Sequence, residues 1–208
     1  MRVTLLLLVG ATGCALLGKN EPSVPRYYTP EYEGDLPESR IRSDLQLRLG
    51  RVQGWSHIRE RMALRTSARE LQYSEDHHWT ERPEIFLRRA LSRTLFEERG
   101  VTASLSSRAV TLDVELLAFE EIERPHVARV QALLVLRDDR IGLLEETITV
   151  EQPVAAAGQA DQARAVVDAL SQVLHTVVTR IAGRVVDRLS RRASLHNEVS
   201  SDGLARPE

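Results

Sequence analysis

Residues 158–192 read GQADQARAVVDALSQVLHTVVTRIAGRVVDRLSRR, the longest periodic stretch of this 208-residue chain. Its apolar side chains recur every three or four residues, at Ala163, Val166, Val167, Leu170, Val173, Leu174, Val177, Val178, Ile181, Val185 and Leu189. This period predicts one long helix with a continuous apolar face. Because burying each Leu or Val contributes about 1.5–3 kcal/mol, that face should dominate the energetics of the core.

The surface that this helix covers is expected in residues 101–154. Apolar and polar residues alternate there, with the apolar set at Val110, Leu112, Val114 and Leu116 and again at Val130, Ala132, Leu134 and Leu136. A turn at Asp138-Asp139-Arg140 leads into a third alternating run that ends at Val150. Three long strands with short connections predict an antiparallel meander with one apolar face.

Shorter elements are predicted before the meander. The segment from Asp44 to Gly50 alternates as a strand, and Ile58–Leu64 and Arg69–Tyr73 indicate two more, the last ended by polar residues 74–76. Thr80–Arg99 is predicted as a helix with Pro83 near its start and Gly100 after its end. The expected fold class is α+β, with an antiparallel sheet covered on one face by two helices, the C-terminal one long.

The first fourteen residues, MRVTLLLLVGATGC, carry the order of a secretory signal peptide: a basic residue, an apolar run and small residues. Small residues directly before Cys14 resemble a bacterial lipobox, which predicts a signal peptide over 1–13 and lipidation of Cys14. An ordinary signal peptide and a short membrane anchor are the alternatives. The apolar run is far shorter than the ~20 residues that span a bilayer.

Residues 14–40 are predicted to be a tether, because Pro22, Pro25, Pro30 and Pro37 interrupt any helix. Tyr27, Tyr28 and Tyr32 lie within this segment, and their rings either pack on the edge of the domain or contact a partner. The domain itself is expected over 41–192. Residues 193–208 are polar and aperiodic, which predicts a disordered tail.

Composition restricts the function classes. A formal net charge of −2 does not favour nucleic acid as a partner. Cys14 is the only cysteine, so the chain has no internal disulfide and no cysteine-based zinc site. The sequence predicts no catalytic residue, no metal site and no cofactor.

The titratable residues that imitate a site have simpler interpretations. His77-His78 is read as a solvated turn and His175 as a residue on the polar face of the long helix. The acidic cluster is read as a solvated rim of the sheet, at Glu115, Glu120, Glu121 and Glu123. A hydrolase or metal enzyme remains an alternative only where one of these histidines meets the acidic cluster in a cleft.

Residues 65–100 read RTSARELQYSEDHHWTERPEIFLRRALSRTLFEERG and resemble the ABC-type transport auxiliary lipoprotein family. The resemblance rests on a strand ending in Tyr73, on Trp79 before a Glu-Arg-Pro-Glu helix start, and on the leucines at 87, 91 and 95. Arg26-Tyr27-Tyr28 is similar to the Tyr-Tyr element of the family. The pairs Gln162-Ala163, Ala169-Leu170 and Val173-Leu174 are similar to its closing helix.

This resemblance implies a non-enzymatic lipoprotein that faces the periplasm from the outer membrane. Its implied partners are an MCE-domain protein and an ABC transporter permease and ATPase, which move lipids or other hydrophobic molecules between the two membranes. Ala15 after the cysteine is compatible with outer-membrane sorting. Tyr27, Tyr28 and Trp79 are the candidate partner contacts, although Trp79 is first expected to pack against the following helix.

Two further interpretations stay open at the level of sequence. An envelope lipoprotein that activates or scaffolds a cell-wall synthase or an assembly machine has the same outline of anchor, tether and small α+β domain. The second interpretation is a homo-oligomer. The long helix exceeds what a small sheet needs, since 35 residues span about 50 Å, and its free part could then contact another copy of the chain.

Overall fold

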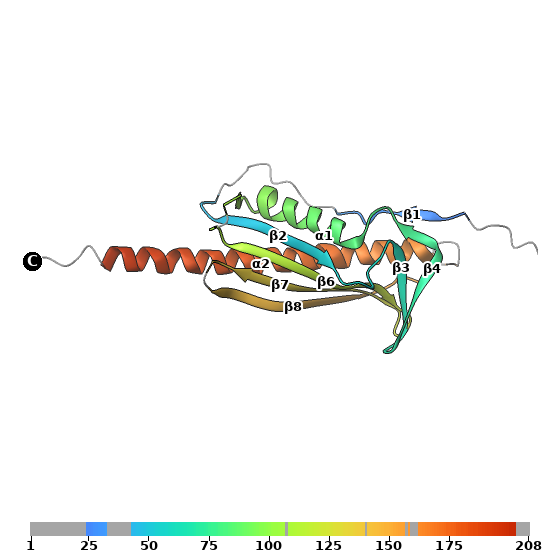
Figure 1. Cartoon of the computed structure of the whole chain (residues 1–208). Coiled ribbons are helices and arrows are strands. Elements are labelled where there is room, and N and C mark those ends of the chain that lie inside the picture. Colours follow the sequence, from blue (N-terminus) through green and yellow to red (C-terminus); the bar gives the residue numbers. More distant parts are fainter. Residues whose placement is uncertain are drawn as a thin grey trace, which may run out of the picture.

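The twelve-residue strand β6 (Thr111–Ile122) is the centre of the sheet in the computed structural model (Figure 1). Strand β7 (Val127–Arg137) runs antiparallel to β6, and β8 (Gly142–Pro153) runs antiparallel to β7. The predicted meander is therefore confirmed. The structure describes residues 24–32, 43–106, 108–139, 141–156, 158 and 162–202, with side chains up to Leu195.

Parallel pairs make up much of the remaining sheet. Strand β2 (Gln46–Gly54) is parallel to the first half of β6, and β3 (Arg61–Ser67) is parallel to its end. Strand β4 (Glu70–Trp79) forms an antiparallel hairpin with β3. The short strands β1 (Arg26–Tyr28) and β5 (Thr102–Ala103) pair in parallel with β4 and β2.

The predicted purely antiparallel sheet is therefore wrong, because the eight-stranded sheet is mixed. Between β2 and β6 the chain passes through a hairpin and a helix, so that β6 starts at the same end of the sheet as β2. Alternation of apolar residues sets which face of a strand is buried but not the direction in which the strand runs.

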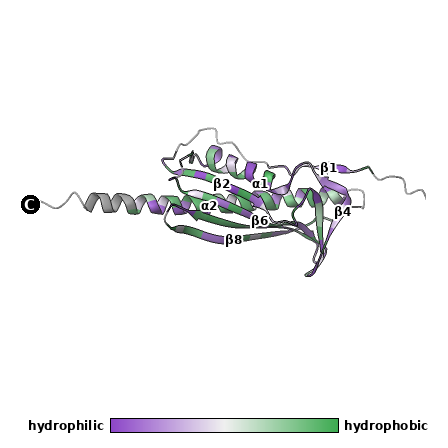
Figure 2. Cartoon of the chain, viewed as in Figure 1, coloured by the Kyte–Doolittle hydropathy of each residue, from purple (hydrophilic) through white to green (hydrophobic). Residues whose placement is uncertain are grey.

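Two helical segments cover one face of this sheet. Helix α1 (Pro83–Ser92), extended by a π-helical turn η1 (Arg93–Glu98), packs on β2. Helix α2 (Gln162–Asp202) packs on β6, β7 and β8 and also contacts α1. Figure 2 shows apolar residues along the central strands and along the part of α2 that lies against the sheet. The predicted two-helix cover and the long C-terminal helix are confirmed.

Helix α2 is apolar because it is the core helix. Of its predicted apolar stripe, all but Ala163 are buried in one cluster with the inward residues of β6 and β7. By length and composition, residues 162–195 would suffice to cross a membrane, but 56% of the most apolar window is buried inside the protein. Burial against the sheet accounts for that apolarity.

Helix α2 ends later in the chain than the sequence predicts. The sequence predicts disorder from residue 193, whereas α2 continues to Asp202. Residues 193–202 contain neither Gly nor Pro, so nothing in their sequence stops a helix that is already nucleated. Residues 203–208 lie outside the described part of the chain.

The first helix begins later than predicted and ends where predicted. Pro83 occupies its first turn, where the missing N–H costs nothing, while the hydroxyl of Thr80 instead lies 2.8 Å from that of Thr29. Gly100 adopts a φ of 66°, and the amide of Val101 donates to the carbonyl of Leu95 at 3.0 Å. This left-handed glycine closes the helix as the sequence predicts.

The acidic cluster contains one residue that is not on a solvated rim. Glu120 is only 1% exposed and accepts two hydrogen bonds from Arg65, at 2.8 and 2.9 Å, and further bonds from Arg129. A β-bulge near Ala118 separates Glu120 from the regular alternation of β6. For Glu120 the predicted solvated position is wrong, because cross-strand arginines from β3 and β7 cover it.

We expect the pairing of Glu120 to make stability depend on pH. Burial alone would raise the pKa of this carboxyl, but the hydrogen bonds and positive charges of Arg65 and Arg129 outweigh burial and lower the pKa below 4.5. A carboxyl with a lowered folded-state pKa stabilises the fold above its unfolded pKa, and this contribution disappears as pH falls through the folded value. Glu120→Gln should therefore lower the free energy of unfolding by about 2–3 kcal/mol at pH 7, and by progressively less below about pH 4.5.

Urea unfolding of wild type and variant between pH 3 and pH 7 checks this expectation. The matched control is Glu115→Gln on the same strand, which should change stability by less than about 0.5 kcal/mol. A pH-independent cost of Glu120→Gln would contradict the role assigned to its charge.

Substitutions on the buried and exposed faces of α2 should differ in their effect on stability. Leu174 is 1% exposed and Leu195, on the same helix, is 63% exposed. Leu174→Ala should lower the free energy of unfolding by about 2–5 kcal/mol, because it leaves a cavity in the core. Leu195→Ala should change it by less than about 0.5 kcal/mol, and equal costs in urea titrations would disprove the assignment of the core face.

Candidate functional site

Residues 24–32 lie on the domain, although the sequence predicts them to be part of the tether. Strand β1 aligns Tyr27 with His78 and Tyr28 with Trp79 at the edge of β4. The amide of Thr80 donates to the carbonyl of Tyr28 at 2.9 Å. Backbone pairing and burial of the tyrosine rings attach this segment to the domain. Its prolines indicate only that the chain is extended. Cys14 and residues 33–40 lie outside the described residues.

The end of this segment is attached to the helices. Tyr32 packs on the core, its ring lies 5.3 Å from that of His175, and its hydroxyl is hydrogen-bonded to Thr94. Burial, partly offset by that hydrogen bond, raises the pKa of Tyr32. The amide of Glu31 donates to Ser171 at 3.1 Å. The prediction that the tyrosine rings pack on the domain is confirmed for Tyr28 and Tyr32, which are partly buried.

The three candidate contact residues meet at the β1–β4 pair. Tyr27 is 64% exposed and its ring lies 5.5 Å from that of His78. Tyr28 is half-buried beside His77 at 5.8 Å. Trp79 is 2% exposed. Of the three, Tyr27 offers the largest free surface for a partner.

Trp79 is enclosed by aromatic rings. Its indole makes edge contacts with Phe119 at 5.2 Å and with Phe86 of α1 at 6.4 Å. The residue therefore joins β4 to β6 and to the helix that follows it, as an aromatic packing residue does.

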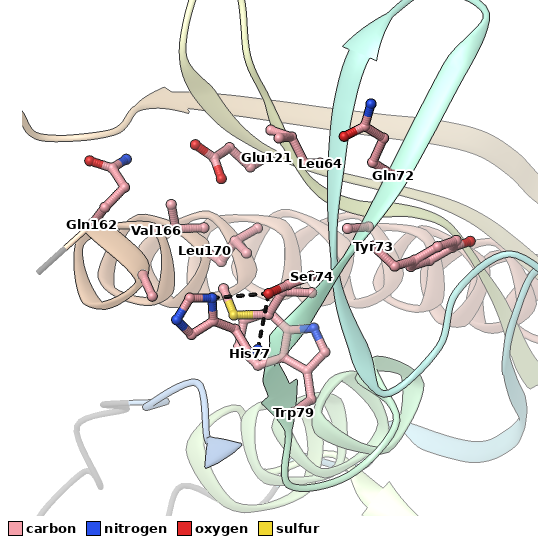
Figure 3. A pocket seen from close by; sticks show the side chains of 13 residues that line it. Leu64, Gln72, Tyr73, Ser74, His77, Trp79, Glu121, Gln162, Val166 and Leu170 are labelled. Atoms are coloured by element: carbon pink, nitrogen blue, oxygen red, sulfur yellow. Dashed lines mark hydrogen bonds between the residues drawn. The ribbon is translucent and has the colours of Figure 1, made fainter. Parts of the chain in front are cut away.

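A cleft of about 510 Å³ opens between the β3–β4 hairpin and the N-terminal half of α2 (Figure 3). Apolar side chains from both sides form most of its wall, and polar side chains join them. The lining residues are Met62, Ala63, Leu64, Gln72, Tyr73, Ser74, His77, Trp79, Glu121, Gln162, Ala163, Val166 and Leu170. A volume of this size lies within the ~300–1,000 Å³ that is usual for small-molecule sites.

The indole nitrogen of Trp79 is buried and has no hydrogen-bond partner. An unpaired buried donor costs about 1–3 kcal/mol, so such groups are rare in folded proteins. The N–H of Trp79 is enclosed by protein atoms and is not exposed to the cleft.

The histidine and carboxylate that line the cleft are engaged with other groups. The Nδ1 of His77 lies 3.0 Å from the hydroxyl of Ser74, and that hydroxyl accepts backbone N–H groups of Asp76 and His77. The carboxylate of Glu121 lies 3.0 Å from the Nε2 of His126. His77 is on a strand, so the predicted solvated turn is wrong: β4 continues through Ser74 to Trp79.

The described residues offer no metal site. Among them, no cluster of three or more His, Cys, Asp or Glu side chains is placed to hold a metal ion. His175 stacks with Tyr32 on α2, and no acidic-cluster residue lines its pocket. The geometry supports a binding cleft better than a catalytic centre.

The sequence does not indicate the cleft as a site. Its lining comes from two hairpin strands, the end of β6 and the start of α2, which are far apart in the chain. Periodicity assigns Val166 and Leu170 to the core, and both are buried there. Of the lining residues, the sequence indicates only Trp79 as a candidate contact, either for packing or for a partner.

The chain matches the family model described as "ABC-type transport auxiliary lipoprotein component" over residues 37–182. Protein XCC0632 from Xanthomonas campestris has a similar crystal structure, with a TM-score of 0.69, 20% identity, and coverage of 81% of this chain and 99% of that one. An uncharacterized protein follows with a TM-score of 0.61, 16% identity, and coverage of 78% and 99%. The hypothetical protein CT253 from Chlamydia trachomatis gives 0.50, 10%, 71% and 98%. At these identities the solved structures show the fold alone. A search of curated proteins gave no match.

The contrast between Trp79 and Tyr27 predicts two different mutational outcomes. Trp79→Ala should lower the free energy of unfolding by about 3–5 kcal/mol, because it removes a ring enclosed by Phe86 and Phe119. Tyr27→Ala should change it by less than about 0.5 kcal/mol, because that ring is mostly exposed. Urea titration of both variants decides the point, and a large cost for Tyr27→Ala would mean that β1 docking depends on this ring.

Proposed function

Because the chain belongs to the ABC-type transport auxiliary lipoprotein family, we propose that it is the lipid-anchored auxiliary subunit of an MCE-type transport system. In this role it faces the periplasm from the outer membrane, anchored by Cys14. It assists an ABC permease, its ATPase and an MCE-domain protein in moving lipids or other hydrophobic molecules between the membranes. The match over residues 37–182 carries the proposal.

The docking of β1 supports a close approach to the membrane. Val24, the first described residue, lies ten positions after Cys14. A fully extended chain covers at most about 35 Å over ten positions. With β1 attached to β4, the domain is held near its anchor, and the reach of the proposed tether is shorter than its 27 residues suggest.

The opposite end of the molecule suits a partner in the periplasm. Strand β1 lies at one end, and the C-terminal part of α2 lies at the other (Figure 1). Ile141 and Leu195 are 61% and 63% exposed at that far end, where they line a pocket with the guanidinium groups of Arg188 and Arg191. Exposed aliphatic groups beside arginines are typical of protein contact surfaces.

The second candidate function is a lipoprotein that activates or scaffolds a cell-wall synthase. It shares the anchor and the small domain. The docking of residues 24–32 weighs against it, because a domain that must pass through the peptidoglycan mesh needs free tether length.

Affinity capture from gently solubilised membranes tests the proposal. The tagged full-length protein should sediment with outer membranes and recover an MCE-domain protein, a permease and an ATPase. Cys14→Ser should move the protein to the soluble fraction and reduce this recovery, because the anchor is lost. Thr12→Ser, which leaves the cysteine and the small residues in place, is the matched control.

Recovery of a cell-wall synthase without transport components would favour the second candidate. Unchanged membrane association of Cys14→Ser would remove the lipid anchor from the proposal.

A further inference from the structure

Strand β8 forms an open edge of the sheet. Among the described residues it pairs only with β7, along its whole length from Gly142 to Pro153 (Figure 1). An edge strand presents unpaired backbone N–H and C=O groups to which another strand can bind, and proteins commonly protect such edges with Lys, Pro or a bulge. From Leu144 to Gln152, β8 has none of these three features, although it carries three glutamates.

The alternation of the backbone identifies the free groups. The amide of Val154 donates to the carbonyl of His126 at 3.1 Å, and the register between β7 and β8 is uninterrupted from Leu144 to Pro153. In an antiparallel pair, residues whose backbone groups point to the neighbouring strand alternate with residues whose groups point away. The even-numbered residues of β8 therefore bond to β7. The outward backbone groups belong to Glu145, Thr147, Thr149 and Glu151.

Both ends of this free section are closed. Arg188 of α2 donates through its Nε to the carbonyl of Leu143 at 2.7 Å. Pro153 falls on the outward series, where its missing N–H costs no bond to β7. The free section is therefore residues 145–151, which span about 20 Å at ~3.3 Å per residue. This length suits a short extended segment of another chain.

Two glutamates give the free section a negative charge. Glu146 points to α2, where its carboxylate lies 3.3 Å from Arg184, so the side chains of the odd-numbered residues lie on the opposite, uncovered face of the sheet. Glu145 and Glu151 are both exposed on that face. The carboxylate of Glu151 lies 3.8 Å from Arg129, whose guanidinium is itself bonded to Glu120. A segment bound at this edge would gain from positive charges at both ends.

A second copy of β8 is a poorer occupant than a basic segment. When two antiparallel copies overlap over the whole free section, Glu145 of each copy lies opposite Glu151 of the other. Like charges directly opposite one another destabilise a strand pair. Registers that avoid this contact leave part of the free section unpaired.

We propose that the β8 edge is a strand-addition site for an extended, basic segment of a partner protein. The segment pairs its backbone with residues 145–151 and places one Lys or Arg opposite Glu145 and another opposite Glu151. Its basic residues are therefore at positions i and i+6, with β-branched residues at i+2 and i+4 opposite the two threonines. The proposal rests on the backbone and charges of β8 and is independent of the proposed transport function.

Two peptides of opposite charge test the charge preference. Lys-Thr-Val-Thr-Val-Thr-Lys and Glu-Thr-Val-Thr-Val-Thr-Glu, each with an N-terminal fluorophore and a C-terminal amide, read the same in both directions and so present the same side chains in either strand direction. We expect the purified full-length protein to bind the Lys peptide at least tenfold more tightly in fluorescence anisotropy at low salt, because two attractive pairs replace two repulsive ones. Added salt should reduce this preference.

A proline substitution tests the location. Thr147→Pro removes one outward N–H and places a ring where the added strand would lie, while the bonds to β7 remain. Thr147→Val changes the side chain, keeps the N–H and is the matched control. The Lys peptide should bind Thr147→Pro at least tenfold more weakly than wild type, and Thr147→Val within about twofold. Thermal unfolding verifies that each variant is folded.

Glu145→Lys tests the charges without changing the backbone, and it remains informative where Thr147→Pro does not fold. Each peptide then meets one like charge and one opposite charge on the edge. The two peptides should therefore bind this variant with affinities equal within about twofold.

Absence of binding by either peptide, equal affinities of the two peptides for wild type at low salt, or unchanged binding by folded Thr147→Pro would each overturn the proposal. A tenfold preference that survives Glu145→Lys would also overturn it. Self-association of the wild type that Thr147→Pro abolishes in sedimentation equilibrium would assign the edge to a second copy and not to a partner. Because only purified protein and peptides are used, failure to capture transport components would not alter these results.

Discussion

The fold depends on one interface, the contact between the apolar face of α2 and the meander β6–β7–β8. Residues from Val166 to Leu189 are buried there on a stretch of helix that runs along the sheet. Each apolar side chain in it contributes about 1.5–3 kcal/mol. The remaining elements attach to this core: α1 covers β2, and the β3–β4 hairpin extends from the end of β6.

That arrangement also creates the cleft. The hairpin pairs with β6 through only Leu64 and Arg65, so most of it extends past the sheet instead of lying flat in it. The N-terminal turns of α2 lie opposite the hairpin. Side chains of the hairpin and of α2 line the space between these two elements. Buried charge secures the junction from the other side, where Arg65 of β3 and Arg129 of β7 both pair with Glu120 of β6. A carboxylate so enclosed needs both partners, because an unpaired buried charge is strongly unfavourable.

Sequence patterns predict correctly the features of the fold that are local and periodic. The long helix, the three strands of the meander and the glycine at position 100 all follow from spacing and backbone preference, and they agree with the structure. The parallel pairing of β2 with β6, the continuation of β4 past Ser74 and the burial of Glu120 depend on contacts between distant segments, which periodicity does not report. The cleft is not predicted for the same reason. The spacing of Val166 and Leu170 indicates core residues, and only the position of the hairpin shows that they also line a cleft.

Trp79 joins the core to the β1–β4 pair. The ring packs between Phe86 and Phe119 and so belongs to the core. The indole N–H is buried without a hydrogen-bond partner, and Trp79 pairs with Tyr28 of β1, the described segment nearest to the proposed anchor. Strand β4 therefore borders the cleft with one side and holds β1 with its edge. Two of the three β4 residues that pair with β1, His77 and Trp79, also line the cleft, so the cleft and the docking site of β1 share one strand.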